Sequence, residues 1–326
     1  MTSCKSVFVV CVALAFAGCA VSVPEPGEPD EPGEPDVPVV EVQPAPAPVI
    51  TPIVPDGACA DPATGCAQSG VIAPTLVAAP SALPTHYPFW LLQMNLCNSG
   101  LAKCYEGGAS VPEGAGVIGD TAPDVVTLNE VCQPDVAQLA TTLAGVYPGS
   151  TVVWAFKAAQ NRTTSAPYKC KNGQDYGIGL VAHIPAPFNG ALTYSGIYAS
   201  QDPASAEERA WLCIHAVGNF YACTTHLSST SGTVALNQCK DLMNNLIPSV
   251  RAAGGGYAPT VVGGDLNMKY RGSPNAQSCV PGGYYRKGDG DVQHVLATSD
   301  LAFSSSRSIG MSHTDHDAWF VAMTAP

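Results

Sequence analysis

The chain has 326 residues, 13 cysteines and a formal net charge of −12. This length suits either two average domains or one large α/β domain with appendages. Hydrophobic residues make up 46% of the chain and charged residues only 12%, which excludes a coiled coil and a disordered polyelectrolyte. The acidic balance also excludes a protein that coats nucleic acid through an overall positive charge.

The first 19 residues have the pattern of a secretion signal. Lys5 precedes an apolar run from Val7 to Phe16, which is too short to cross a bilayer as a helix. Phe16-Ala17-Gly18-Cys19 resembles a bacterial lipobox, in which the cysteine is lipidated and becomes the new N-terminus. We therefore predict an exported protein, extracellular or on the cell surface, with a membrane tether through lipidated Cys19. An ordinary signal peptide cleaved nearby is the alternative.

A linker rich in Pro, Glu and Asp is predicted at residues 20–85. Its segment 22–57 has low complexity and carries eight acidic residues but no basic one. Because proline restricts φ and like charges repel, we expect an extended, disordered spacer. Without these eight acids and Lys5, the chain keeps 18 acidic and 13 basic residues. The remainder, which contains the folded domain predicted at residues 86–326, is thus only mildly acidic.

The cysteines divide into two groups. Cys4, Cys11 and Cys19 fall in the predicted signal, and the other ten form an even number, which predicts disulfides in an exported protein. The spacing favours, without proving, the pairs Cys59–Cys66, Cys97–Cys104, Cys213–Cys223, Cys132–Cys170 and Cys239–Cys279. A zinc site is disfavoured because the sequence has no Cys-x-x-Cys motif.

Apolar patterning predicts an α/β domain from about residue 86. Short apolar runs bounded by Gly, Pro and Asn predict strands at 89–94, 125–128, 151–156, 178–182, 211–217, 220–225, 260–262, 292–297 and 318–321. Helical periodicity runs over 136–146 and over 236–250, where we expect Pro248 to kink or shorten the helix. Many strands and few helices predict sheet packed on sheet.

Polar residues end several of these strands, although a buried strand does not need them there. They are Asn95, Glu130, His226, Asp265 and Asn267, followed near the C-terminus by the run 312–317. Carboxylates and amides on one rim are ligands of a hard cation such as Mg²⁺, and histidines transfer protons or hold a phosphate. Each residue alone is more often part of a turn or a surface, but the set in this order predicts a catalytic site.

On these motifs the chain resembles the endonuclease/exonuclease/phosphatase superfamily, whose fold is deoxyribonuclease I-like. The matching segments are Gln93-Met94-Asn95, Asn129-Glu130-Val131, Thr225-His226-Leu227, Gly264-Asp265-Leu266-Asn267 and Thr314-Asp315-His316-Asp317. The resemblance covers residues 87–322. It implies a four-layer α/β sandwich, in which two mixed β-sheets pack face to face with helices outside.

The resemblance also implies a division of roles. Glu130, with Asn95 and Asp315 close by, is expected to bind Mg²⁺ (or Mn²⁺ or Ca²⁺). Asp265 and Asn267 would orient the attacking water and the phosphate. His316 would be the general base or proton carrier, and His226 would stabilise the phosphoryl oxygens or the leaving group.

Gln293 departs from the pattern of the superfamily. The superfamily usually has an aspartate there, which orients a catalytic histidine, and glutamine cannot stabilise an imidazolium by charge. Asp291, on the same sheet face, is a candidate substitute, and Asp175 is a candidate partner for His226. We expect a less basic catalytic histidine and a faster Gln293→Asp variant at neutral pH.

The leading functional prediction is an exported, divalent-metal-dependent phosphodiesterase, a monomeric nuclease of low sequence specificity, with Lys269 and Arg271 as phosphate contacts. A sphingomyelinase or a phosphoinositide phosphatase is the first alternative. A lipid enzyme would benefit from an exposed apolar hairpin, for which Tyr284-Tyr285 is a weak candidate. A catalytically degenerate surface binding lipoprotein, with Gln293 as the mark of decay, is the second.

Overall fold

A computed structural model describes residues 68–72 and 86–326. The predicted signal, the lipidated cysteine, most of the predicted linker and the Cys59–Cys66 pair lie outside the described residues. Among the residues described, no helix is both long and apolar enough to cross a membrane.

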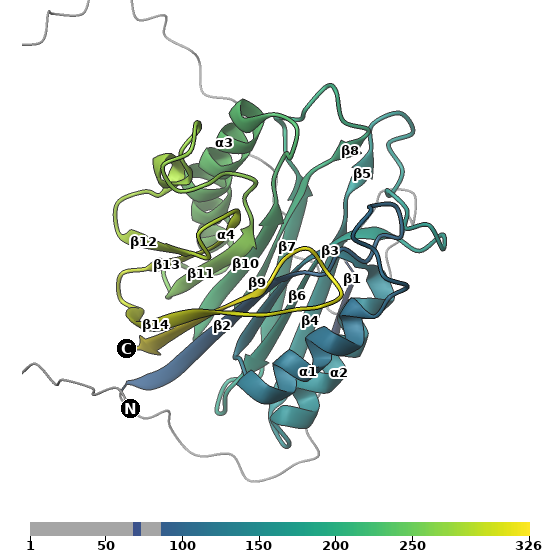
Figure 1. Ribbon diagram of the computed structural model, residues 1–326. Coiled ribbons are helices and arrows are strands. Elements are labelled where there is room, and N and C mark those ends of the chain that lie inside the picture. The colour runs from purple at the N-terminus through teal and green to yellow at the C-terminus, as the bar shows by residue number, and fades with distance from the viewer. Residues whose placement is uncertain (1–67, 73–85) are drawn as a thin grey trace, which may run out of the picture. The chain divides into compact units, whose positions relative to one another are not determined.

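Two mixed β-sheets form the centre of the domain (Figure 1). The seven-stranded sheet has the order β1 (Gln68–Ile72), β4 (Thr151–Ala158), β6 (Tyr176–Ile184), β3 (Val125–Cys132), β2 (Tyr87–Asn95), β15 (Ala318–Ala325), β14 (Ala302–Ile309). The six-stranded sheet has the order β12 (Tyr284–Gly288), β13 (Gln293–Thr298), β11 (Thr260–Asp265), β10 (Phe220–His226), β9 (Ala210–Ala216), β7 (Ala191–Ile197). The two-residue strands β5 (Gln160–Asn161) and β8 (Glu207–Glu208) pair separately.

Helices cover the outer faces of both sheets. α1 (Ser110–Thr121) and α2 (Gln133–Val146) pack on the seven-stranded sheet, and α3 (Gly232–Asp241) and α4 (Ile247–Ala253) pack on the six-stranded sheet. A short 3₁₀ turn follows at Ala276–Cys279. Between the sheets lies a continuous apolar core, to which both contribute buried residues such as Leu91, Leu180, Leu212 and Val261. The expected four-layer α/β sandwich is therefore confirmed.

The predicted elements are all present, with two informative differences. The second predicted helix is interrupted by a π-helical turn, Leu242–Leu246, immediately before α4. Pro248 explains the break, since proline has no N–H for the helical ladder and π-bulges accommodate such faults. β1 lies inside the predicted linker and pairs antiparallel with β4, where Gly70 leaves room for the indole of Trp154.

Four disulfides hold the domain, and each matches a pair favoured by the spacing. They are Cys97–Cys104, Cys132–Cys170, Cys213–Cys223 and Cys239–Cys279. The Cys213–Cys223 bridge joins residues that face each other across the β9–β10 hairpin. This number of disulfides is consistent with an exported protein.

The sheet topology gathers the ends of four strands at one rim. β2 and β3 run parallel in one sheet, and β10 and β11 run parallel in the other. The carboxyl ends of each parallel pair therefore lie at one edge, and the two edges face each other across the sandwich. Asn95, Glu130, His226 and Asp265 stand at these ends, so the fold brings together residues that are up to 170 positions apart.

Candidate active site

A buried cluster of one amide and two carboxylates lies at the rim. The Nδ2 atom of Asn95 donates to Glu130 Oε1 at 3.0 Å and to Asp265 Oδ2 at 3.2 Å. Glu130 has a φ of 55° and sits where the β3–β6 register shifts. A positive φ in a non-glycine residue is strained, and bulges of this kind re-aim side chains at functional sites. The backbone at Glu130 thus turns its carboxylate into the cluster.

Asn267 has the second positive φ of the site, 50°. Its backbone N–H donates to Asp265 Oδ1 at 2.9 Å, and its Nδ2 donates to the carbonyl of Leu227 at 2.9 Å. Both interactions use donors of Asn267, so its side-chain carbonyl oxygen is left to accept from a ligand. The Gly-Asp-x-Asn segment therefore fixes Asp265 and Asn267 relative to each other.

A layer of buried amides supports the cluster from below. Asn129 Oδ1 accepts from the backbone N–H of Asp265 at 2.7 Å and from Gln93 Nε2 at 2.8 Å. Gln93 also donates to Gln293 Oε1 at 3.3 Å, and Gln293 donates to the carbonyl of Asp317 at 2.5 Å. Gln293 thus links the two sheets through neutral hydrogen bonds, and within the described residues it makes none to His316.

The two carboxylates predicted as substitutes do not reach the histidines. Asp291 forms an ion pair with Lys269 at 2.7 Å and is largely exposed. Asp175 forms an ion pair with Lys169 instead of His226. Both predictions are wrong for the same reason: each carboxylate pairs with a lysine, Asp175 with one on its own loop and Asp291 with one on the loop after β11.

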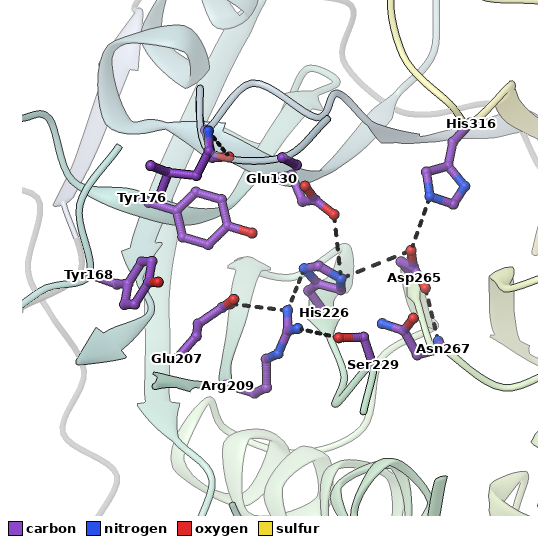
Figure 2. A pocket seen from close by; sticks show the side chains of 13 residues that line it. Glu130, Tyr168, Tyr176, Glu207, Arg209, His226, Ser229, Asp265, Asn267 and His316 are labelled. Carbon is purple, nitrogen blue, oxygen red and sulfur yellow. Dashed lines mark hydrogen bonds and ion pairs between the residues drawn. The ribbon is translucent and has the colours of Figure 1, made fainter. Parts of the chain in front are cut away.

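His226 contacts an arginine where a carboxylate was predicted (Figure 2). Arg209 Nη1 lies 2.7 Å from His226 Nδ1, 3.0 Å from Glu207 Oε1, and Nη2 donates to Ser229 Oγ at 3.2 Å. A guanidinium has only donors, so Nδ1 of His226 must be the acceptor and its proton must reside on Nε2. That Nε2 atom lies 3.9 Å from Glu130 Oε1 and 4.0 Å from Asp265 Oδ2. His226 therefore presents a neutral N–H donor to the cluster.

Burial and Arg209 set the charges around His226. Burial, the neighbouring Arg209 charge and His316 hold the pKa of His226 well below its usual range. Burial alone would lower the pKa of Arg209, but the carboxylate of Glu207 and other nearby acids outweigh it and raise that pKa. The fixed positive charge of this part of the site is thus on Arg209.

His316 and Asp315 stand on the loop before β15. His316 Nε2 lies 3.7 Å from Asp265 Oδ2 and 3.7 Å from Asp315 Oδ1. The His316 side chain is 23% exposed and the Asp315 side chain 60% exposed. His316 therefore joins the cluster directly, whereas Asp315 borders it through His316 and has no recorded contact with Glu130 among the described residues.

The cluster opens into a pocket of about 320 Å³ (Figure 2). One half is lined by Glu130, His226, Asp265, Asn267 and His316. The other half consists of residues that strand-end polarity did not indicate: Ser99, Leu101, Ala102, Tyr168, Tyr176, Glu207, Arg209 and Ser229. Two disulfides staple this second wall, because Cys97–Cys104 closes the loop of Leu101 and Cys132–Cys170 ties the segment of Tyr168 to β3.

The donor set suits a divalent cation. Burial raises the pKa values of both Glu130 and Asp265, and the charge of Asp265 raises that of Glu130 further. Hydrogen bonds from Asn95 and the charges of His316 and Arg209 act on both pKa values in the opposite direction. Two buried carboxylates this close are costly as anions unless a cation joins them. Glu130 and Asp265 offer the hard oxygen atoms that such a cation prefers, whereas Asn95 turns its Nδ2 towards them and its Oδ1 accepts from the backbone N–H of Cys97 at 3.1 Å. The sulfur atoms of Cys97 and Cys104 lie within 4.8 Å of Asp315, but as a disulfide they supply no thiolate ligand.

Arg209 is the most important residue of the site that sequence patterning missed. It stands at the start of a strand, whereas the patterning examined strand ends. The predicted hairpin contains a signal that could have revealed Arg209. If Cys213 pairs with Cys223 across two antiparallel strands, then three residues further along the pairing Ala210 lies opposite His226. The structure has this register, and Arg209 lies next in the chain.

Known proteins resemble the chain in sequence pattern and in fold. The model of the endonuclease/exonuclease/phosphatase family matches residues 115–316. A family member from Bacteroides thetaiotaomicron superposes with a TM-score of 0.52 at 11% identity, over 74% of this chain and 100% of that one. A family member from Beutenbergia cavernae gives 0.52 at 18% identity, over 73% and 71% of the chains.

A third structure, ANGEL2, described as a 2′,3′-cyclic phosphatase, gives a TM-score of 0.51 at 13% identity, over 73% of this chain and 95% of that one. These identities are low, so the structural likeness shows the fold alone. No curated protein sequence matches the chain. The family match spans most of the chain and includes Glu130, His226, Asp265, Asn267 and His316. The chain therefore belongs to the endonuclease/exonuclease/phosphatase family, whose members are phosphoric ester hydrolases that use divalent metal ions.

Proposed function

We propose that the chain is an exported phosphodiesterase that uses Mg²⁺ to cleave nucleic acid with low sequence specificity. The observation that carries the proposal is the convergence of two carboxylates on one histidine nitrogen: Glu130 Oε1 lies 3.9 Å and Asp265 Oδ2 4.0 Å from His226 Nε2. Two carboxylates that can bind a cation and one N–H donor thus line the same pocket, and the guanidinium group of Arg209 lies beside the donor. A tetrahedral phosphate with two non-bridging oxygens fits these charges.

Each residue has a role that follows from its protonation and position. The Nε2–H group of His226 donates a hydrogen bond to a phosphoryl oxygen. Arg209, which contacts the other ring nitrogen, adds a positive charge that persists at any physiological pH. Asp265 and the free carbonyl oxygen of Asn267 orient the attacking water in line with the leaving oxygen. His316, partly exposed beside Asp265, accepts or supplies the proton. Mg²⁺ held by Glu130 and Asp265 would supply Lewis-acid stabilisation of the developing charge.

The surface argues for nucleic acid over a membrane lipid. Tyr284 and Tyr285, the candidate apolar hairpin, are partly buried and pack against the two cores, and Tyr285 donates to the carbonyl of Leu301 at 2.8 Å. The large exposed apolar side chains of the described residues are scattered: Leu101, Tyr105, Val217, Tyr257, Tyr270 and Phe303. They stand on five separate segments of the chain, and none of the described hairpins carries several of them as an apolar tip of the kind that inserts into a bilayer.

The proposal is tested by assaying the protein on five substrates with Mg²⁺ or with EDTA. They are plasmid DNA, RNA, a chromogenic phosphodiester, the corresponding phosphomonoester and sphingomyelin. We expect Mg²⁺-dependent cleavage of DNA or RNA and of the chromogenic diester. Turnover of sphingomyelin or of the monoester alone would replace the nuclease proposal. No turnover with any divalent cation would favour a binding protein.

A thermal-shift measurement tests the metal site without turnover. At neutral pH, Mg²⁺ at 100 times its dissociation constant should stabilise the protein by about 2.7 kcal/mol. Glu130→Gln removes an anionic ligand and should abolish this stabilisation. Asp120→Asn is the matched control, because it removes an exposed carboxylate near the beginning of β3, whereas Glu130 stands near the opposite end of that strand; it should respond like the parent protein. Equal stabilisation of Glu130→Gln would contradict the assignment.

A further inference from the structure

A cationic platform of Tyr270, Arg271 and Arg286 stands beside the candidate active site. The ring of Tyr270 is 47% exposed, and the guanidinium carbon atoms of Arg286 and Arg271 lie 4.4 and 5.1 Å from its centroid. Arginines that stack on an aromatic ring keep their N–H edges free for other partners. One ring thus holds both guanidinium groups within 5.1 Å of its centroid.

A neutral histidine anchors the platform to the sheet. His294 Nε2 lies 2.7 Å from the carbonyl oxygen of Met268, and Arg286 Nη1 lies 2.9 Å from His294 Nδ1. The carbonyl only accepts, so Nε2 carries the proton and Nδ1 accepts from Arg286. Backbone hydrogen bonds from Gly272 and Ala276 to Lys269 close the loop. The platform is therefore ordered before any ligand arrives, which lowers the entropic cost of binding.

Arg271 and Arg286 lack an ion pair among the described residues, although Asp289 is close enough to Arg286 to act on its charge. Lys269 forms an ion pair with Asp291, but neither Arg271 nor Arg286 forms one with any carboxylate in residues 68–72 or 86–326. Their recorded side-chain partners are the Tyr270 ring, His294 and Gln277. Other described cations, such as Lys240 and Arg307, also lack an ion pair; Arg271 and Arg286 differ from them in standing together at one exposed tyrosine ring, where both can serve an anionic ligand.

The position of the platform relates it to the scissile phosphate. Its loop begins two residues after Asn267, and the strand order β12-β13-β11-β10-β9 sets Arg286 of β12 two strands from Asp265 of β11. Two strand spacings amount to about 10 Å, and the register sets Arg286 level with Val262, three residues before Asp265 in β11, so the backbone positions are farther apart than that. Arg209, which precedes β9, lies on the other side of Asp265 in the same order. A single phosphate at the cluster cannot reach the platform, whereas a chain of phosphodiesters can.

We propose that the platform of Tyr270, Arg271 and Arg286 binds a backbone phosphate of a polynucleotide next to the one that is cleaved. The inference rests on the proposed nuclease function and narrows it to polymeric substrates. The two guanidinium groups make charge-assisted hydrogen bonds to the phosphate oxygens and release counterions from the strand. The platform reads no base, in keeping with low sequence specificity.

The test compares a polymer with a small substrate in the same protein. The Arg271→Gln/Arg286→Gln variant should lose about tenfold or more in kcat/KM on a single-stranded oligonucleotide, and keep its rate on a chromogenic phosphodiester. The salt dependence of oligonucleotide binding by the metal-free protein in EDTA, followed by fluorescence anisotropy, should fall by about 0.7 in slope for each lost contact. This binding measurement does not depend on turnover.

Two controls keep the outcomes separate. Lys240→Gln/Arg307→Gln removes the same charge from α3 and β14, neither of which lines the pocket, and should leave both substrates unaffected. The Arg271→Gln variant keeps the hydrogen bond between Arg286 and His294, so it should fold normally and lose part of the activity on the oligonucleotide. It replaces the double variant in the test if the double variant is poorly folded. Equal loss on both substrates, or none on the oligonucleotide, would overturn the platform. If the parent protein cleaves the chromogenic diester but neither binds nor cleaves the oligonucleotide, the proposed polynucleotide binding is contradicted and the hydrolase activity is supported. If it cleaves neither substrate, both proposals are contradicted.

Discussion

Replacing Arg209 with methionine tests whether this arginine serves catalysis or only the fold. Its side chain is 8% exposed and holds Glu207, whose own side chain is 16% exposed. Removing one partner of a buried ion pair costs about 3 kcal/mol or more, because the other charge remains buried. Removing one preorganised donor near the reacting phosphate costs roughly 10²-fold to 10³-fold in kcat. The single variant should therefore lose both stability and activity.

A second variant separates the two losses. In Glu207→Gln/Arg209→Met both members of the ion pair are removed, so most of the stability lost with that pair should return, while kcat stays about 10²-fold low. Chemical denaturation measures the first quantity, and hydrolysis of a chromogenic phosphodiester the second. Arg209→Lys keeps the charge without the guanidinium fork and should rescue part of the rate. If activity returns together with stability in the double variant, Arg209 is only structural and the reasoning is refuted.

The ring nitrogens of His226 give an independent measurement. In the parent protein Nδ1 accepts from Arg209, so ¹⁵N chemical shifts should report the Nε2–H tautomer in metal-free protein. Arg209→Met removes the donor that selects this tautomer, and a mixture of tautomers should follow. An unchanged Nε2–H population in the variant would show that other contacts fix the ring.

Three further outcomes are expected. Gln293→Asp should lose about 1–3 kcal/mol of stability without gaining rate at neutral pH, because aspartate cannot donate to the carbonyl of Asp317; thermal unfolding and a pH–rate profile check this, and a faster enzyme would restore the original expectation. Burial lowers the pKa of His294 to about 4, so its neutral form favours the folded state above the unfolded pKa of about 6.5, and about 3 kcal/mol should be lost as pH falls from 6.5 towards 4. His294→Gln should flatten the denaturation profile in that window, and an unchanged profile would contradict the assignment. Cys97→Ser/Cys104→Ser should cost about 2 kcal/mol by freeing the loop in the unfolded chain, and should raise KM more than it lowers kcat, because this loop lines the pocket.

Sequence patterning predicted those elements that bury one face or end in a polar residue. The strands of the sandwich core were visible as apolar runs, and the disulfides were visible from spacing. α1 was missed because Gly114, Gly116 and Gly119 interrupt its apolar stripe. β14 was missed because it is an exposed, serine-rich edge strand with no alternation to detect. In both cases packing against a neighbour, not local propensity, decides the structure.

The candidate site divided in the same way. Residues at the ends of parallel strands were predicted because topology alone brings such ends together. Arg209, Tyr168 and Tyr176 were missed because they enter the pocket from a strand start and from irregular loops. Asp175 was predicted as the partner of His226, but it forms an ion pair with Lys169 instead. Which charged side chain contacts a given histidine depends on the other ion pairs that are available in the folded protein, and the spacing of residues along the chain does not reveal these.

The two disulfides beside the pocket make its second wall dependent on the compartment. Cys97–Cys104 and Cys132–Cys170 close the loops that carry Leu101 and Tyr168, and thiols in the cytosol stay reduced. If the chain is exported as proposed, it lacks these two disulfides, which shape half of the pocket, until it has left the cytosol. If the chain cleaves nucleic acid as proposed, the cell that makes it gains a safeguard: the enzyme matures only where the producer's own genome is out of reach. Comparing the reduced and oxidised protein on one substrate measures the strength of that safeguard.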